Sequence, residues 1–304
     1  MLTPDDVTIA DVRAARDRLA GIVTRTPVVR LEVPGVDADV WLKLENLQPI
    51  GSFKLRGAAN AMLLAGKEEL AQGAYTASAG NMAQGVAWSA RRLAVPCRVV
   101  VPDHAPRTKL DAIERLGGEI ITVPFDRWWQ TLVDHEYPGL PGVFVHPVSD
   151  PAVIAGNGTI GLEIVEDVPD VDTVLVPFGG GGLSCGIATA VRAVRPGVKV
   201  IACEVATAAP LSAALHAGAP RQVDYTRSFV DGIGARSVLA EMWPLARELL
   251  DGALVVSVDQ IAAAVRLLAE RARVVAEGAG AAPLAAAITH RLQGNVVCIV
   301  SGGN

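Results

Sequence analysis

Cysteine, aromatic residues, basic clusters and long apolar runs are all scarce in this sequence. The four cysteines, Cys97, Cys185, Cys203 and Cys298, lie far apart, with no C-x-x-C pair and no cluster of cysteine with histidine. This spacing excludes a disulfide framework and a cysteine-rich metal site, and it favours a reduced, cytoplasmic protein. No apolar run reaches the about eighteen residues that a membrane-spanning helix requires, and the N-terminal segment is acidic rather than basic and then apolar. We therefore expect neither export nor membrane insertion.

Aromatic residues make up only 4% of the chain, and the net charge of −5 arises from charges of both signs that are dispersed along it. No basic run of the kind that follows a phosphate backbone is present, so nucleic acid is excluded as an expected partner. Hydrophobic residues, in contrast, fill 51% of the 304 positions, enough for the cores of one large or two modest domains. The composition is typical of a globular enzyme.

Short β-branched segments recur along the chain, and most are separated by helical stretches. This alternation predicts an α/β fold with parallel sheets covered by helices. A stretch rich in proline and glycine, Tyr137–Pro151, separates two groups of strands and predicts two lobes with a cleft between them. Thr8, followed by Asp11, predicts the start of the first helix. The expected strands are Pro27–Leu31, Val40–Glu45, Tyr75–Ser78, Cys97–Val101, Ile120–Val123, Thr173–Pro177, Val198–Glu204, Leu254–Val258 and Val296–Val300.

Lysine is also scarce, and of the five in the chain only Lys54 is flanked by glycines, in the segment Gly51-Ser52-Phe53-Lys54-Leu55-Arg56-Gly57. This segment is expected to open a helix, with Ser52 as its cap. A helix start and burial both favour the uncharged amine that an imine with an aldehyde requires. The alternative is a surface lysine on a solvated turn, and this loop alone does not decide between them.

Three further loops follow expected strands, where helix N-termini present unpaired N–H donors. Ser78-Ala79-Gly80-Asn81 is small enough to bring those donors to a substrate carboxylate, or it is simply a tight turn capped by Asn81. Gly179-Gly180-Gly181-Gly182-Leu183 indicates a close approach of backbone to a phosphate. Ser301-Gly302-Gly303-Asn304 suits a side-chain contact to a ring nitrogen, or it is only a chain end.

A dinucleotide site is the competing interpretation of the glycine run. Glu204 follows about twenty residues later at a strand end, as a ribose-binding acid would. The order G-x-G-x-x-G cannot be placed, however, because Ser184 and Cys185 stand where the last glycine should fall. The lysine of a P-loop is missing too, so a phosphate cradle of another kind is favoured.

Taken together, these motifs occur in an order and spacing that resemble the threonine/serine dehydratase and serine racemase family of fold-type II pyridoxal-phosphate (PLP) enzymes. The matching stretches also include Lys43-Leu44-Glu45-Asn46, Pro147–Gly161 and Ala276–Ala282, so the resemblance covers nearly the whole chain. It implies a two-lobed fold like that of the tryptophan synthase beta chain, with the cofactor in the cleft. Residues 1–46 and 151–304 would form a large cofactor-binding domain, and residues 47–150 a small mobile domain.

The resemblance also implies roles for individual residues. Lys54 would form the Schiff base with the cofactor and then remove the Cα proton of the substrate. A neutral serine at the ring nitrogen would favour elimination over transamination. The other implied contacts are Phe53 beside the cofactor, Asn81 at the 3-hydroxyl, Gly179, Gly180, Gly181, Gly182 and Leu183 at the phosphate, Ser301 at the ring nitrogen, and Ser78, Ala79, Gly80 and Asn81 at the substrate carboxylate.

The sequence departs from the family pattern at several positions. Ala79 stands where related racemases have a proton-transferring serine, so racemisation is disfavoured. Pro210 replaces the second acidic residue of the racemase cation site near Glu204, so we expect no tightly bound divalent ion. Met82 replaces a common histidine, and Trp128-Trp129 add bulk as core packing or as a substrate wall. These departures leave the substrate open.

The favoured function is a PLP-dependent dehydratase (ammonia-lyase) that converts a serine-like or threonine-like amino acid to a 2-oxo acid and ammonia. The alternatives are a racemase, a β-replacement enzyme, or a PLP-binding protein without turnover. Analogy with the family suggests a homodimer. Because the sequence stops at Asn304, no regulatory domain is expected.

Overall fold

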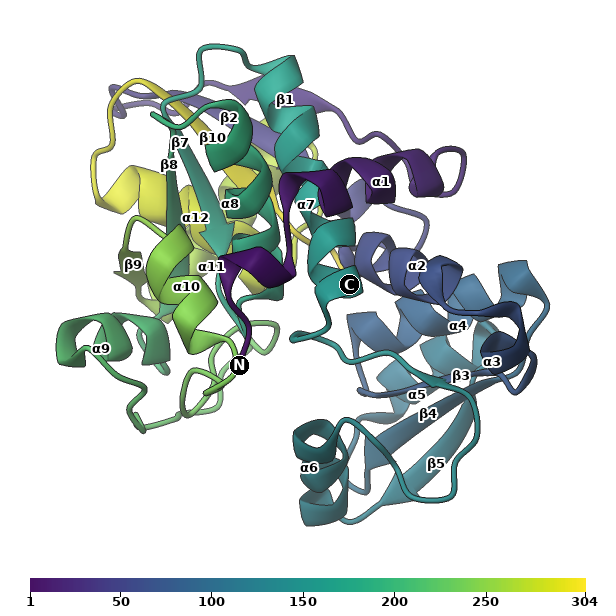
Figure 1. Cartoon of the computed structure of the whole chain (residues 1–304). Helices are drawn as coiled ribbons and strands as arrows, with labels where there is room; N and C mark the ends of the chain where they lie inside the picture. The colour runs from purple at the N-terminus through teal and green to yellow at the C-terminus, as the bar shows by residue number, and fades with distance from the viewer.

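The computed structural model describes all residues, 1–304, and its strands form two separate sheets, one in each half of the molecule in Figure 1. The larger sheet has the strand order β1-β2-β10-β7-β8-β9, and the smaller has the order β5-β4-β3-β6. All neighbouring strands are parallel except β1 and β2. The strands are β1 (Val28–Leu31), β2 (Asp39–Leu44), β3 (Ala74–Ala77), β4 (Cys97–Pro102), β5 (Glu119–Val123), β6 (Val143–Phe144), β7 (Thr173–Pro177), β8 (Lys199–Val205), β9 (Ala253–Val256) and β10 (Asn295–Val300).

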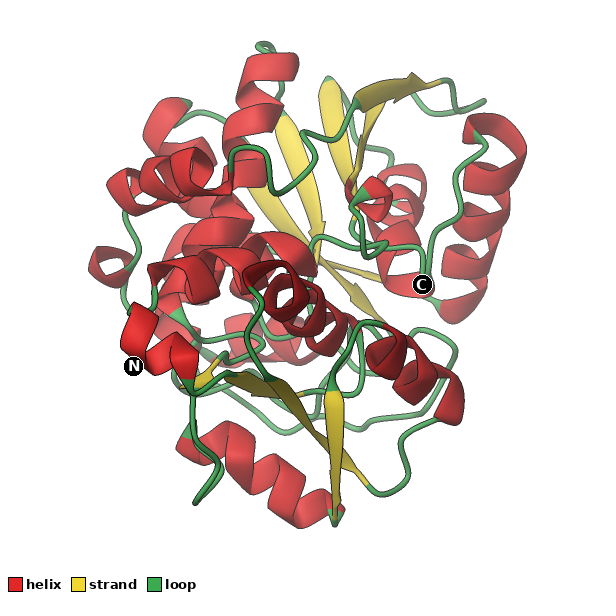
Figure 2. Ribbon diagram, turned by 90° about the vertical axis from the view of Figure 1, so that its right-hand side faces the viewer, coloured by secondary structure: helices red, strands yellow, loops and turns green.

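Helices pack around both sheets, as the view in Figure 2 shows. None of them combines the length and apolar composition needed to span a bilayer. The helices are α1 (Ile9–Leu19), α2 (Lys54–Leu64), α3 (Lys67–Ala71), α4 (Asn81–Leu93), α5 (Arg107–Arg115), α6 (Phe125–Asp134), α7 (Pro151–Asp167), α8 (Gly182–Val194), α9 (Pro210–Ala217), α10 (Trp243–Leu249), α11 (Val258–Leu267) and α12 (Gly278–Thr289). Short 3₁₀ helices lie at Pro4–Asp6 and Glu45–Leu47, and a π-helix lies at Leu268–Ala272.

The predicted α/β fold with parallel sheets is confirmed, and each of the nine expected strand segments contains a strand. The sequence pattern missed only β6, because two residues are too short to show an alternation. The helix start at Thr8 is also confirmed, since its hydroxyl accepts from the Asp11 N–H and the Asp11 carboxylate accepts from the Thr8 N–H. Both cues are local, and the tertiary fold retains them.

Each sheet is built from its own parts of the chain. Residues 1–46 supply β1 and β2 to the larger sheet, where β2 pairs with β10, and residues 47–150 supply all four strands of the smaller sheet. The division into a large domain (1–46 and 151–304) and a small mobile domain (47–150) stays a prediction, because sheet membership does not report motion.

Helix α7 lies between α2 and α8, and its glycines allow very close packing. A Cβ on Gly156 would lie 2.5 Å from the carbonyl oxygen of Arg56 in α2, and one on Gly186 of α8 would lie 2.4 Å from the carbonyl oxygen of Ile154 in α7. Such distances leave no room for a side chain, so glycine is required at both positions. The consequence is that α2 and α8 are held at fixed positions on one central helix.

Candidate active site

A cavity of about 160 Å³ lies where the carboxyl ends of strands from both sheets meet. Its wall includes residues from the loops after β3, β7 and β10 and from the start of α2. Ala79 and Gly80, expected at the substrate carboxylate, do not line it. The residues expected to contact the cofactor or the substrate that do line it are Phe53, Lys54, Ser78, Asn81, Gly179, Gly180, Gly181, Gly182, Leu183 and Ser301.

Lys54 is the first residue of α2, and it forms part of the cavity wall. The Nζ atom donates a hydrogen bond to the carbonyl oxygen of Pro147 at 2.7 Å and lies 5.2 Å from the centre of the Phe53 ring. Burial lowers the pKa of the Lys54 amine to about 8, an effect that the negative charge of Glu277 partly opposes. The uncharged amine expected from the sequence is therefore accessible near neutral pH.

The prediction that Ser52 caps α2 is wrong. The residue at the N-cap is Phe53, and the hydroxyl of Ser52 is buried without a hydrogen-bond partner instead of accepting from the first turn. Backbone pairing takes over the anchoring, because Ser52 bridges Gly302 and the N–H of Phe53 donates to the carbonyl of Ser301 at 3.0 Å. This pairing brings the start of α2 against the loop that carries Ser301.

The glycine run forms the turn between β7 and α8. Gly181 is the N-cap with φ of 99°, a conformation that favours glycine, and α8 leaves the N–H groups of its first turn without helical partners. A Cβ on Gly180 would lie 2.6 Å from the Val148 methyl groups, and one on Gly182 would lie 2.6 Å from the Val148 carbonyl oxygen. The turn therefore presents free backbone donors to the cavity, as a phosphate site requires.

Asn81 opens α4, and its side-chain amide is held from two sides. Its Nδ2 atom donates to the Glu277 carboxylate at 3.2 Å, and its Oδ1 atom accepts from the Asn304 amide at 2.7 Å. Sequence reasoning missed Glu277, which lines the cavity from the start of α12. Burial raises the pKa of this carboxyl to about 6, and the hydrogen bond from Asn81 partly opposes that rise. The one available signal was an acid alone among small residues in Ala276–Ala282.

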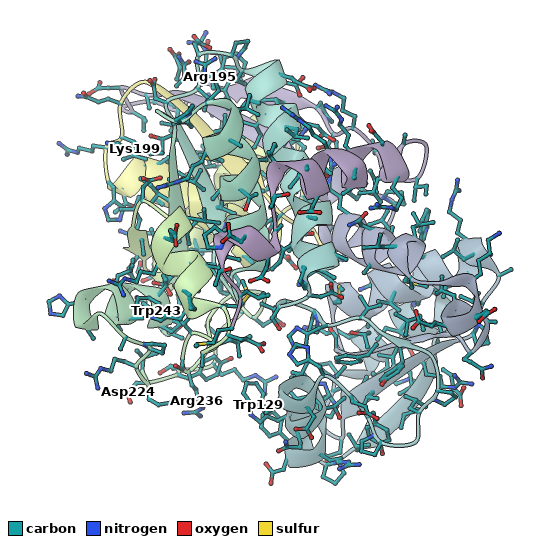
Figure 3. The ribbon with its side chains drawn as sticks, viewed as in Figure 1. Trp129, Arg195, Lys199, Asp224, Arg236 and Trp243 are labelled. Atoms are coloured by element: carbon teal, nitrogen blue, oxygen red, sulfur yellow. The ribbon has the colours of Figure 1, made fainter.

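The structure shows where the other residues that depart from the family pattern lie relative to the cavity. Met82 is buried and lines the cavity. Trp128 and Trp129 do not line it: Trp128 packs beside the smaller sheet, and Trp129 is 45% exposed on α6 (Figure 3). The carboxylate of Glu204 accepts the N–H groups of Leu211 and Ser212, each at 2.7 Å. The expected absence of a divalent ion near Glu204 stays a prediction.

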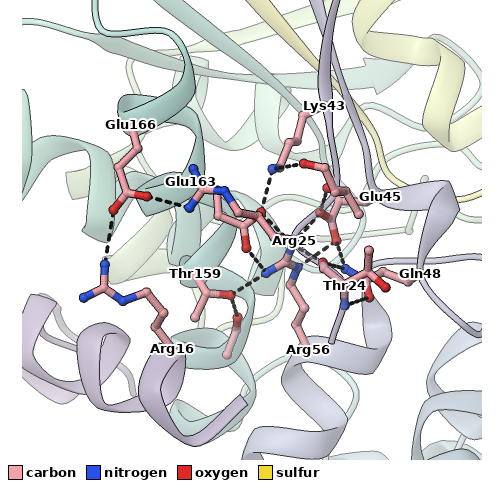
Figure 4. A network of polar contacts seen from close by, with 12 residues as sticks. Arg16, Thr24, Arg25, Lys43, Glu45, Gln48, Arg56, Thr159, Glu163 and Glu166 are labelled. Carbon is pink, nitrogen blue, oxygen red and sulfur yellow. Dashed lines mark hydrogen bonds and ion pairs between the residues drawn. The ribbon is translucent and has the colours of Figure 1, made fainter. Parts of the chain in front are cut away.

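A buried network of charges holds α2 at Arg56, two residues after Lys54 (Figure 4). Arg56 donates two hydrogen bonds to Glu45, both at 2.8 Å, and two to Glu163, at 2.7 and 2.9 Å. Lys43 donates to Glu163 at 2.6 Å and to the carbonyl of Thr26 at 2.7 Å. Because two cations face two carboxylates, the network is balanced in charge, and it joins α2 to β2 and α7.

The residues of this cavity fit the PLP cofactor. An amine of lowered pKa, backbone donors at a helix start where side chains would clash, and a buried serine at a strand end are the groups that an aldehyde, a phosphate and a ring nitrogen require. The fit depends on residues far apart in sequence that the fold gathers in one place.

Comparisons with known proteins agree with this chemistry. The chain matches the family described as pyridoxal-phosphate dependent enzyme over residues 19–302. It is 42% identical to an L-threonine ammonia-lyase of Geobacter sulfurreducens, over 96% of this chain and 74% of that protein. Among solved structures it resembles a threonine deaminase from T.th., with a TM-score of 0.91 and 35% identity over 98% of both chains, and maize serine racemase, with a TM-score of 0.89 and 32% identity over 98% of this chain and 94% of that one.

The chain therefore belongs to the pyridoxal-phosphate dependent enzyme family, and its cofactor is pyridoxal 5'-phosphate. The predicted fold-type II architecture and the predicted reaction class, a PLP-dependent lyase of the dehydratase type, are confirmed. The roles expected of single residues stay predictions.

Proposed function

We propose that this enzyme deaminates L-threonine, and L-serine as a second substrate, by α,β-elimination to a 2-oxo acid and ammonia. The observation that carries the proposal is the Lys54 amine, with its pKa near 8, in one cavity with the glycine turn. The relative that is 42% identical is an L-threonine ammonia-lyase, which supports the choice of substrate.

Bound PLP supplies an aldehyde for the amino group and a ring that withdraws electrons from the Cα–H bond. In the proposed assignment, the Lys54 amine would hold the cofactor through its aldehyde. When free, the same amine would accept the Cα proton, with the carbonyl of Pro147 holding it in place. The free N–H groups around Gly179, Gly180, Gly181, Gly182 and Leu183 bind the phosphate.

Other residues orient the reacting groups. Phe53 packs beside the ring, Asn81 donates to the ring hydroxyl, and Ser301 contacts the ring nitrogen. Ser78 and the N–H groups at the start of α4 bind the substrate carboxylate. Because Ala79 carries no transferable proton and lies outside the cavity wall, elimination is favoured over racemisation. The Cα proton and the β-hydroxyl are lost together as one water, and addition of one water to the resulting enamine gives one 2-oxo acid and one ammonia.

The test is a substrate panel with the purified protein. L-Threonine is expected to give 2-oxo acid and ammonia in equal amounts, without the D-isomer or a thioether when a thiol is added. Lys54→Ala is expected to abolish the visible absorbance of the attached cofactor and all turnover. A protein that binds PLP but releases D-allo-threonine, the product of inversion at Cα, would instead be a racemase, and one that releases a thioether would be a β-replacement enzyme. A protein that releases nothing would be a binding protein.

Two broader features belong to the same proposal. We propose a cytoplasmic homodimer, on the reduced cysteines and the family analogy. Light scattering of the purified protein measures the oligomeric state, and a monomeric mass would contradict this part alone.

A further inference from the structure

The segment His146–Ser149 lies between β6 and α7 and contacts both Lys54 and the glycine turn of the proposed cofactor site. Its Pro147 carbonyl accepts from the Lys54 amine at 2.7 Å. Its Val148 occupies the space opposite Gly180 and Gly182, where added Cβ atoms would approach to 2.6 Å. A shift of this short segment therefore moves the lysine's acceptor and the wall of the glycine turn together.

One side chain sets the shape of this segment. His146 is only 3% exposed, and its Nδ1 atom accepts from the N–H of Ser149 at 2.8 Å, the hydroxyl of Ser149 at 2.8 Å and the N–H of Val148 at 3.2 Å. Backbone N–H groups only donate, so Nδ1 carries no proton and the ring is the neutral Nε2–H tautomer. The backbone from Val148 to Ser149 is therefore bent toward Nδ1 of His146.

The surroundings keep the ring uncharged. Burial, followed by the charges of His135 and Lys54, lowers the pKa of His146 to about 3. The His135 ring stacks on His146 with centres 4.3 Å apart, and its Nε2 atom faces the Glu241 carboxylate at 3.2 Å. His135, His146 and Glu241 have the residue types of a metal site, but Nδ1 of His146 is already occupied by the segment it shapes. A positioning role therefore fits the contacts better than metal binding.

We propose that His146 is a positioning residue, whose unprotonated Nδ1 folds residues 146–149 so that Pro147 holds the Lys54 amine and Val148 packs against the glycine turn. This inference rests on the proposed role of Lys54 in attaching PLP. His146 does not touch the reacting atoms in this scheme. It acts through the position and the desolvation of Lys54.

The experiment compares three variants of the apoprotein. His146→Asn keeps an acceptor oxygen at nearly the place of Nδ1, and His146→Leu keeps bulk without an acceptor. His135→Phe is the matched control, because it keeps a stacked ring and all three contacts of His146 Nδ1. It removes only the contacts of His135 Nε2 with Glu241 and, at 3.5 Å, with the Ser149 hydroxyl. The rate of PLP attachment is measured by absorbance from pH 6 to pH 10, and thermal unfolding of each apoprotein is measured beside it.

We expect His146→Leu to attach PLP roughly ten to a hundred times more slowly, since small displacements of reacting groups have effects of that size. Its pH midpoint is expected to rise from near 8 toward the ordinary lysine value of 10.5. His146→Asn and His135→Phe are expected to stay within about threefold of the wild type. If His146→Leu is less stable but keeps the wild-type rate and midpoint, its role is structural only and the inference is wrong.

A second measurement covers the case in which His146→Leu does not fold. Nitrogen NMR of the wild-type apoprotein should find His146 as the neutral Nε2–H tautomer down to about pH 4. Titration of this ring above about pH 5.5 would overturn the inference. If instead wild-type apoprotein fails to attach PLP at all, the proposed function fails first, so the two failures are distinguishable.

Discussion

The glycine turn gives the sharpest test of the cofactor site, through the substitution Gly182→Ala. Gly182 opens α8, and the added Cβ would lie 2.6 Å from the carbonyl oxygen of Val148, about 0.8 Å closer than ordinary van der Waals contact. A backbone oxygen cannot rotate away as a flexible side chain can, so either the turn or the 146–149 segment must move. Overpacking of this kind costs about 1–3 kcal/mol, which corresponds to roughly 5- to 150-fold weaker cofactor binding if the strain falls on the bound state.

The assay is a titration of apoprotein with PLP, followed by the absorbance of the attached cofactor and by thermal unfolding. Gly197→Ala is the matched control, because an added Cβ there meets no atom within 4 Å on an exposed turn, and it is expected to bind like the wild type. Gly181→Ala should weaken binding as well, since its φ of 99° is strained for alanine. Wild-type affinity in Gly182→Ala, with unchanged stability, would refute the assignment of this turn to the phosphate.

Three further predictions concern the lysine, the network behind it and the exposed tryptophan. The rate of PLP attachment should rise with pH and level off above about 8. The reason is that the lowered pKa of Lys54 raises the uncharged fraction of its amine at pH 7 by roughly two to three hundredfold over an ordinary lysine. A midpoint near 10.5 would contradict the buried placement of Lys54. Arg56→Met should lower the free energy of unfolding, measured by urea titration, by about 3–5 kcal/mol, because it leaves Glu45 and Glu163 buried without their main partner. A loss below about 1 kcal/mol would mean that water reaches the network. Trp129→Ser should leave kcat/KM for threonine within about twofold, because this exposed residue lies outside the cavity wall, and a larger change would make it part of the substrate site.

The sequence predicted the fold well because the relevant signals are local. β-Branched runs mark nine of the ten strands, and the capping box at Thr8 marks the first helix. The glycine run is an equally local signal, since four consecutive glycines carry an entropic cost that only a tight backbone approach justifies. The same reasoning failed at Ser52, where pairing with the distant Gly302 replaces the expected cap.

The parts of the site that the sequence did not reveal depend on long-range contacts. Glu277 accepts a hydrogen bond from Asn81, 196 positions away, and the Pro147 carbonyl accepts one from Lys54 across 93 positions. Arg56 is a similar case, because its carboxylate Glu163 lies 107 positions further along the chain. No local pattern encodes such partners, since a carboxylate or a carbonyl looks the same in sequence whether it faces solvent or a buried cation.

These long-range contacts explain how one short helix can serve both chemistry and stability. The first turn of α2 needs an amine that is easily uncharged, whereas two residues later it carries Arg56, which must stay charged against two carboxylates. Burial acts on both groups, and the difference lies in their neighbours. Lys54 faces a carbonyl and an aromatic ring, with Glu277 as the one opposing charge, and Arg56 faces two carboxylates at hydrogen-bond distance. The ionisation of these two bases is therefore set by the segments that pack on each side of α2, and moving a carboxylate from one side to the other should exchange a reactive lysine for a structural one.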